Sequence, residues 1–194
     1  MLKITNKITT YCVREKIVKQ EDVLWFQYSL EKKFTTIIIG IPFFILALVI
    51  SNLLYAISFF GTYFYIKKYL GGYHAKTIWG CLVLSLLFEL LFLGIISHFL
   101  HEPISFILLT VCTLAILILA PYNHPNLHLT LEEAKMCHKK SILRLFSILM
   151  IIIVSFIAGF DAVSNGCTIG IAMATALLCL GYINDWRKTL WKKT

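Results

Sequence analysis

Residues 67–81, KKYLGGYHAKTIWGC, form a short polar segment between two long apolar parts of the chain. Two lysines begin the segment, two glycines precede His74, and Cys81 ends it where the next apolar run starts. A thiol beside an imidazole at a membrane border is the arrangement of a cysteine nucleophile with its base. The same residues also fit a basic loop at a membrane surface, in which the histidine and a buried cysteine have no chemical role.

The composition of the chain indicates an integral membrane protein. Of its 194 residues, 59% are hydrophobic and only 14% are charged, and the mean hydropathy is +0.81. Soluble domains average roughly 25% charged residues. Because apolar runs recur along almost the whole length, a soluble module on one anchor is excluded. We predict a single integral membrane domain over residues 1–194.

The pattern outward from the polar segment predicts an all-α, polytopic membrane protein with six transmembrane helices. Residues 34–66 carry no charge, and as one helix they would be about 50 Å long, against a hydrocarbon core of roughly 30 Å. Ser51-Asn52 offers a turn near their middle, and Pro42 should kink the first half. Polar residues then place a loop at 121–141 and a turn from Asp161 to Gly166. The expected spans are about 35–50, 53–67, 81–97, 104–120, 142–159 and 167–183.

Residues 1–33 are polar and basic, with apolar residues at helical spacing. Ile4, Ile8 and Tyr11 make one such stripe, and a second apolar cluster surrounds Trp25. We predict one or two N-terminal amphipathic interfacial helices on the cytoplasmic membrane surface, with Trp25 at the interface. A plain solvated helix is the alternative interpretation of this segment.

The distribution of charge predicts the orientation. All 18 Lys and Arg residues fall on one side of the six-span arrangement, in the N-terminal segment, the 67–80 segment, the 121–141 loop, the C-terminal tail and the adjoining helix ends. Because positive residues stay cytoplasmic, we predict a multi-pass cell-membrane protein with both termini, His74 and Cys81 on the cytoplasmic side. Membrane lipids are expected as partners of the basic face, and nucleic acid is not.

The chemistry of the polar segment needs a bend in the chain. His74 and Cys81 would lie about 10.5 Å apart along the axis of one straight helix, too far for a hydrogen bond. The glycines around them make a bend easy to form. Cys81 would then sit near the N-terminus of the third span, where the helix dipole and Lys76 favour a thiolate. We therefore expect Cys81 as nucleophile and His74 as its acid and base.

Other chemistry-bearing residues are less informative. Glu89 lies within the third span, where a bare charge costs roughly 3 kcal/mol; it could be protonated, pair across helices or orient the site, and a structural role is favoured over catalysis. Glu132-Glu133 are similar to the paired glutamates of CAAX-type membrane metalloproteases, but they fall in an expected loop without the further ligands. A proline between His124 and His128 argues against a zinc pair. No metal or other cofactor is expected.

Two motifs resemble one known family. The sequence GGYHA at residues 71–75, with Cys81 six residues beyond it, resembles the signature of the accessory gene regulator B (AgrB) family. The stretch APYNHPN at 120–126, followed by Glu132-Glu133, resembles that family's cytoplasmic loop. Members are bacterial membrane cysteine endopeptidases of quorum sensing, and their catalytic histidine and cysteine map to His74 and Cys81.

The resemblance implies a substrate and a reaction. The substrate would be an AgrD-type propeptide with an amphipathic leader and an acidic C-terminal tail. Cys81 would attack the bond before that tail, and a cysteine or serine of the peptide would capture the acyl-enzyme as a thiolactone or lactone. The lysines expected to bind the acidic tail are Lys67, Lys68, Lys76, Lys139 and Lys140.

The resemblance also implies a homodimer, and small residues of the last two spans would allow close helix packing. These residues are Ala158, Gly159, Gly170, Ala172, Ala174 and Ala176. The alternative function class is a non-enzymatic membrane protein, such as a small transporter or a scaffold. Transporters usually carry more polar residues within their spans than the nearly solitary Glu89.

Overall fold

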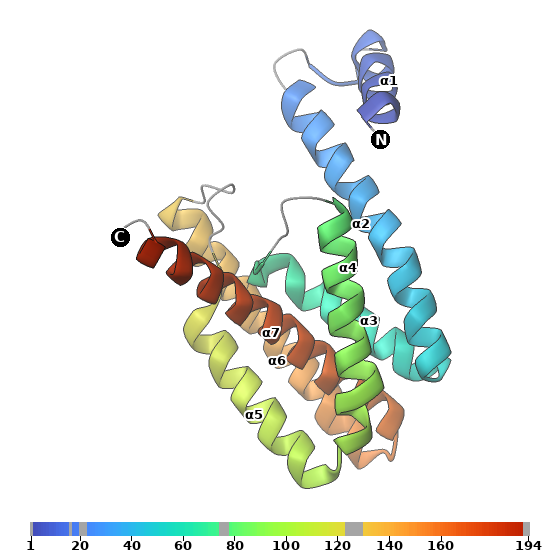
Figure 1. Cartoon of the computed structure of the whole chain (residues 1–194), viewed down its shortest axis with the longest axis vertical. Coiled ribbons are helices and arrows are strands. Elements are labelled where there is room, and N and C mark those ends of the chain that lie inside the picture. The colour runs from blue at the N-terminus through green and yellow to red at the C-terminus, as the bar shows by residue number, and fades with distance from the viewer. Residues whose placement is uncertain (1, 16, 20–22, 74–77, 123–129, 192–194) are drawn as a thin grey trace. The chain divides into compact units, whose positions relative to one another are not determined.

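The computed structural model describes residues 2–15, 17–19, 23–73, 78–122 and 130–191. Every regular element in these ranges is a helix, which confirms the all-α class (Figure 1). The helices are α1 (Leu2–Arg14), α2 (Val23–Ile50), α3 (Leu53–Leu70), α4 (Ile78–Glu89), the π-helical turn η2 (Leu90–Ile95), the 3-10 turn η3 (Ile96–Phe99), α5 (Glu102–Leu119), α6 (Leu131–Ile157) and α7 (Asp161–Trp191).

The chain forms two compact units, Met1–Ile45 and Leu46–Thr194. In the first unit, α1 is joined to α2 by a hydrogen bond of 2.7 Å from Gln27 Nε2 to Asn6 Oδ1. Thr5 on α1 is buried, whereas Asn6 is exposed, so α1 has one buried and one solvent-exposed face. Its location on a membrane surface stays a prediction.

The prediction that the Trp25 cluster forms a surface helix separate from the first span is wrong. Helix α2 begins at Val23 and runs without a break to Ile50, and it includes Pro42. The reason is that the charged residues at 31–33 are good helix formers. The change from polar to apolar residues within α2 therefore does not coincide with a helix end. It separates a polar part of one continuous helix from an apolar part.

The predicted turn at Ser51-Asn52 is confirmed. Helix α3 begins at Leu53, and the Asn52 side chain accepts a hydrogen bond of 2.8 Å from the backbone N–H of Tyr55. This N-cap satisfies one of the backbone donors that a helix start leaves free. It separates the first two apolar helices near the middle of the uncharged stretch.

Helix α7 is the centre of the second unit, where it packs against α3, α5 and α6 (Figure 1). Gly166 and Gly170 let α7 approach α3 closely, because a Cβ on them would lie 2.8 Å from the Tyr55 carbonyl oxygen and 2.9 Å from that of Phe59, respectively. This is the small-residue packing of membrane helices. Gly170 and its small neighbours Ala172 and Ala174 are thus buried within the chain, so they give no support to a homodimer, which stays a prediction.

The predicted loop over residues 121–141 is too long. Helix α6 begins at Leu131, one residue after Thr130, which accepts from the backbone N–H of Glu133 while the Glu133 carboxylate accepts from the N–H of Thr130. This reciprocal capping starts the helix well before the apolar run. These hydrogen bonds also lower the pKa of Glu133. Glu132-Glu133 therefore lie in the first turn of α6 and not in a loop.

The predicted turn from Asp161 to Gly166 is also misplaced. Helix α7 already begins at Asp161, and the chain reverses at Ala158–Phe160, where Gly159 has φ +72°. A positive φ is accessible to glycine at little cost, so Gly159 and not the later polar residues makes the turn. Asp161 falls in the first turn of α7, where its negative charge complements the helix dipole.

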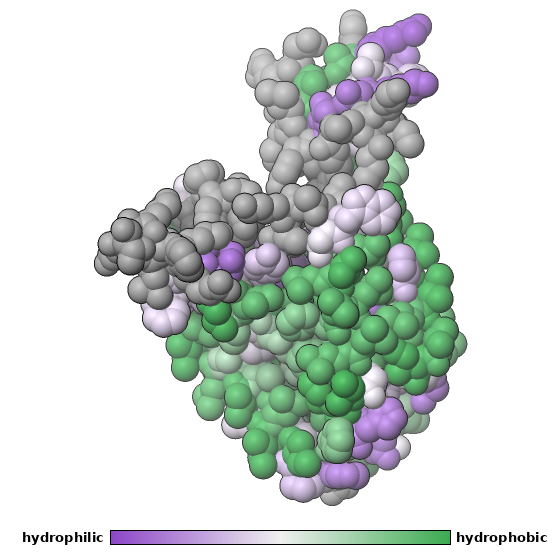
Figure 2. Space-filling model, in the orientation of Figure 1, coloured by the Kyte–Doolittle hydropathy of each residue, from purple (hydrophilic) through white to green (hydrophobic). Residues whose placement is uncertain are grey.

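Within the part of the chain that the structure describes, three helices are long and apolar enough to cross a membrane by length and composition: Trp79–Phe99, Leu131–Ile157 and Asp161–Trp186. Two shorter apolar helices cover Thr36–Ile50 and Pro103–Leu119. Figure 2 shows apolar side chains over much of the visible face of the second unit. Exposed apolar residues of this unit include Val83 of α4 and Val111 of α5. Such a surface suits lipid, and the count of six spans stays a prediction.

Candidate active site

The two glycines of the GGYHA motif form the turn that ends α3. Gly71 has φ +71° and Gly72 has φ +118°, values that side-chain-bearing residues rarely adopt. The backbone also passes close to other segments here. A Cβ on Gly71 would lie 2.5 Å from the Tyr122 carbonyl oxygen, and one on Gly72 would lie 2.9 Å from the Leu177 carbonyl oxygen. Both conformation and space therefore require glycine.

Two backbone hydrogen bonds of 2.9 Å hold this glycine turn in place. Tyr122 N–H donates to the Leu70 carbonyl, and Tyr73 N–H donates to the Leu177 carbonyl. The end of α3, the segment after α5 and the middle of α7 thus meet at one point. Residues 70–73 and 120–122, which carry the two motifs that resemble AgrB, are direct neighbours in space.

Tyr122 anchors this meeting point. It is 4% exposed, and its hydroxyl donates a hydrogen bond to the Asp185 carboxylate on α7. Burial and then the Asp185 hydrogen bond raise the pKa of Tyr122. A Cβ on Gly181 would lie 3.2 Å from the Tyr122 ring, so α7 is shaped to receive the ring. His138 Nδ1 on α6 donates to the Ala120 carbonyl at 2.7 Å, which ties the same segment to α6.

Cys81 lies in the first turn of α4 and is half-buried. The backbone is non-helical at Tyr73 and helical from Ile78, so Tyr73 and Cys81 do not share a helix. The expected base, His74, and the flanking Lys76 lie outside the described residues.

Helices α3 and α4 carry buried polar groups, among them the Tyr63 side chain, the Lys67 Nζ and the Glu89 carboxyl. Lys67 and Tyr63 of α3 are both close enough to interact electrostatically with the Cys81 thiol, and Tyr63 interacts in the same way with Glu89. Glu89 is fully buried at the end of α4, where the helix widens into the π-helical turn η2. Such π-helical turns are frequent at functional sites. Within the described part of the chain, the Glu89 carboxyl has no hydrogen-bond partner.

Cationic side chains of α3 and α6 gather around two tyrosines. The Arg144 guanidinium lies 4.2 Å from the ring centre of Tyr65 and 4.3 Å from that of Tyr69. The ammonium groups of Lys140 and Lys68 lie 5.3 Å and 5.7 Å from the Tyr69 ring centre. Cation–π contacts of this kind hold α6 beside the end of α3. We call Lys68, Lys140 and Arg144 the basic cluster.

Comparison with known protein families identifies the family of this chain. The model of the family described as Accessory gene regulator B matches residues 3–179. The chain belongs to the accessory gene regulator B family. Membership confirms the resemblance seen in the sequence and implies a role in quorum-sensing peptide processing. No curated protein and no solved structure matches the chain.

The predicted site residues of this AgrB-family chain differ in location and in solvent exposure. Cys81 lies at the start of α4, Lys68 and Lys140 contact Tyr69, and Lys139 is exposed on α6. Lys67 differs from Lys68, Lys139 and Lys140, because its Nζ atom is buried.

Sequence reasoning missed Tyr63 and Tyr122. Tyr63 lies four residues before Lys67 on α3, which is one helical turn and places both on the same face. That spacing is the signal by which Tyr63 could have been found. Tyr122 falls within the stretch that resembles the family loop, but its contacts with Gly71 and Asp185 depend on long-range packing.

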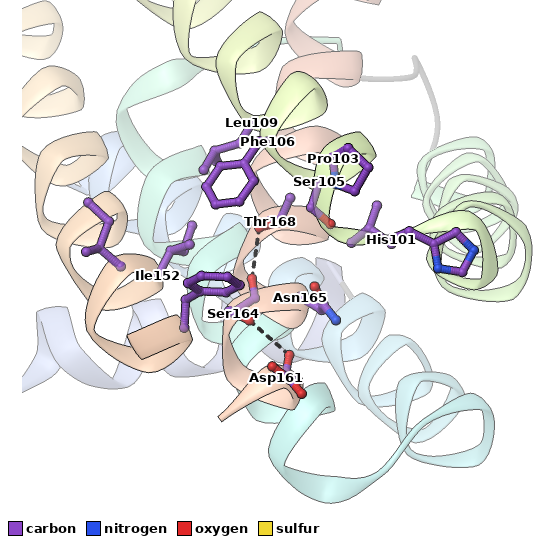
Figure 3. A pocket seen from close by; sticks show the side chains of 13 residues that line it. His101, Pro103, Ser105, Phe106, Leu109, Ile152, Asp161, Ser164, Asn165 and Thr168 are labelled. Carbon is purple, nitrogen blue, oxygen red and sulfur yellow. Dashed lines mark hydrogen bonds between the residues drawn. The ribbon is translucent and has the colours of Figure 1, made fainter. Parts of the chain in front are cut away.

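A cavity of about 610 Å³ lies between α5, α6 and the start of α7 (Figure 3). Its apolar wall includes Phe106 and Ile152, and α7 contributes Ser164 and Thr168, whose hydroxyls donate to carbonyls of their own helix. Leu177 of α7 contacts the glycine turn. Thr168 lies nine residues before Leu177 on the same helix, a distance of about 13 Å along the helix axis. The cavity is therefore separate from the candidate active site.

Proposed function

We propose that this AgrB-family chain is a multi-pass membrane cysteine endopeptidase that cleaves a quorum-sensing propeptide and closes it into a ring. The observation that carries the proposal is the position of Cys81. The thiol lies in the first turn of α4, at the end of the polar segment that holds the family motif, and Lys67 of α3 acts on it electrostatically. A helix N-terminus and a neighbouring cation are the features that activate a cysteine nucleophile.

In the proposed mechanism, His74 takes the proton of the Cys81 thiol, and the thiolate attacks the carbonyl before the acidic tail of an AgrD-type propeptide. The C–N bond breaks, His74 returns the proton to the leaving amine, and the peptide stays attached to Cys81 as a thioester. A cysteine or serine of the peptide then attacks the thioester and closes a thiolactone or lactone ring. Cys81 regains its proton, and exclusion of water prevents hydrolysis of the thioester.

Co-expression of the chain with a candidate AgrD-type propeptide tests this function. We expect mass spectrometry to show loss of the acidic tail and a product one water lighter than the hydrolysed peptide. The reason is that the peptide's own thiol or hydroxyl takes the acyl group from Cys81, so no water is added. An intact propeptide would contradict the peptidase. A hydrolysed linear product would contradict the cyclisation alone.

We predict that the basic side chains bind the acidic tail. Charge reversal at exposed Lys139 and Lys140 should slow cleavage, and the effect should be larger at low salt because the Debye length grows as salt falls. The measurement is the cleavage rate across ionic strengths. A propeptide with a neutralised tail is the matched control, since its cleavage should not respond to these substitutions. An equal loss with both propeptides would show that the lysines do not recognise the tail.

We also propose the orientation, with both termini in the cytoplasm. Cys167, near the expected outer face, is 3% exposed and is a poor target for a thiol reagent. In a variant without the native cysteines, Ala158→Cys should therefore be labelled by an impermeant reagent in intact cells, whereas Lys139→Cys should be labelled only after permeabilisation. Both positions are exposed. Labelling of Lys139→Cys in intact cells would reverse the orientation.

A further inference from the structure

We propose that the basic cluster, formed by Lys68, Lys140 and Arg144, is a binding site for one anionic phospholipid, whose phosphate lies against the facing parts of α3 and α6. The inference concerns a single lipid at a defined position, and not the general attraction of a basic surface to a membrane. It needs no step of the peptidase reaction.

The first support is the concentration of positive charge around Tyr69. The Nζ atoms of Lys68 and Lys140 and the Cζ atom of Arg144 all lie within 5.7 Å of the centre of its ring. The ring attracts each cation through its quadrupole, but it has no net charge. The cluster therefore keeps three positive charges that repel one another, and a bound anion relieves this repulsion.

The second support is that the acidic residues of the surrounding helices lie elsewhere. Helix α3 has none, and those of α6 are Glu132 and Glu133 in its first turn, about 10 Å or more along the axis from the cluster. On α7, Asp161 lines the separate cavity, and the Asp185 carboxylate accepts a hydrogen bond from Tyr122. The anion that balances the cluster is therefore expected to come from outside the chain.

Arg144 has the geometry that a phosphate requires. Its guanidinium is fixed against the rings of Tyr65 and Tyr69, and one N–H group donates to the Tyr65 carbonyl. A guanidinium has five N–H donors, so others remain for a ligand. Two of them match two oxygens of one phosphate. Lys68 and Lys140 are exposed and add two point charges beside this fork.

The place of the cluster along both helices favours a lipid over a soluble phosphate. No charged residue occurs at 53–66 of α3 or at 145–157 of α6, so the cluster lies where the apolar part of each helix meets the polar part. Ile57 and Gly61 continue the face of Tyr65 at intervals of four residues, and both are exposed. Ile151, two turns beyond the cluster on α6, is exposed as well. A phosphate at the cluster thus places acyl chains along apolar surface.

The test measures lipid binding by the purified full-length chain in detergent micelles. Native mass spectrometry counts the lipid molecules retained while palmitoyl-oleoyl phosphatidylglycerol, or phosphatidylcholine with the same chains, is titrated. We expect the anionic lipid to bind at least about tenfold more tightly than the zwitterionic one. Arg144→Gln should weaken the binding of phosphatidylglycerol roughly tenfold, because the fork that holds the phosphate is lost.

Lys135→Gln is the matched control. Lys135 is an exposed lysine of α6 five residues before Lys140, so it points about 140° away from Lys140 around the helix. Its replacement removes the same charge and should keep wild-type binding. The double variant Lys68→Gln/Lys140→Gln alters exposed side chains and should also lower the affinity for phosphatidylglycerol roughly tenfold. It carries the comparison if Arg144→Gln does not fold.

The inference would be overturned by equal affinity for the two lipids, by wild-type affinity in both cluster variants, or by an equal loss in Lys135→Gln. Displacement of phosphatidylglycerol by an equal concentration of glycerol phosphate would show a site for free phosphate instead. Displacement by an equal concentration of an acidic peptide would assign the cluster to the propeptide tail. Since the test uses no propeptide cleavage, the proposed peptidase function can hold or fail independently of this result.

Discussion

Replacing Cys81 with alanine should abolish processing of the propeptide, with a fall in the cleavage rate of at least about 10⁴-fold. The reason is that the substituted chain has no nucleophile to form the thioester, and the remaining binding interactions cannot replace that covalent step. His74→Ala should cause a loss of similar size, because the thiol then lacks its base. The double variant should be no worse than either single variant, since the two groups act in one step.

Cys137→Ala is the control for the nucleophile. Cys137 is a half-buried free cysteine on α6 with no place in the proposed chemistry, so its replacement should leave processing unchanged. Membrane insertion of all variants is measured by fractionation and immunoblotting, which separates lost chemistry from lost protein. Continued processing by the Cys81→Ala variant would contradict the proposal that the protein is a cysteine peptidase.

The second large effect is expected at the glycine turn. Gly71→Ala should lower the free energy of unfolding by about 3 kcal/mol, because alanine is strained at φ +71°. The new Cβ would also press on the Tyr122 carbonyl oxygen, a backbone atom that cannot rotate away. The turn would shift, the hydrogen bond between Tyr122 and Leu70 would break, and processing should fall although Cys81 is intact. Thermal unfolding and the processing assay measure the two effects.

Gly61→Ala is the matched control on the same helix. Gly61 has no atom within 4 Å of its would-be Cβ, and its substitution should raise helix propensity by about 1 kcal/mol. Gly61→Ala should therefore keep both stability and processing. If Gly71→Ala behaved in the same way, neither the positive φ of Gly71 nor its close approach to Tyr122 would matter for stability or processing.

The sequence by itself determined the features that depend on local pattern. The uncharged run 34–66, too long for one span, required the turn at Ser51-Asn52, and Asn52 caps α3 there. The spacing of GGYHA and Cys81 identified the family, which the match over residues 3–179 confirmed. Local pattern failed at the helix ends of α2, α6 and α7, because charged residues and caps extend a helix beyond its apolar part.

The tertiary structure alone decided which distant segments meet at the site. Leu70 pairs with Tyr122 and Tyr73 with Leu177, contacts between residues too far apart in sequence for any periodicity to reveal. It also separated Lys67 from Lys68. These adjacent lysines are indistinguishable in sequence, yet successive residues of a helix point about 100° apart. The packing around α3 therefore buries the Lys67 ammonium group and leaves Lys68 exposed over the Tyr69 ring.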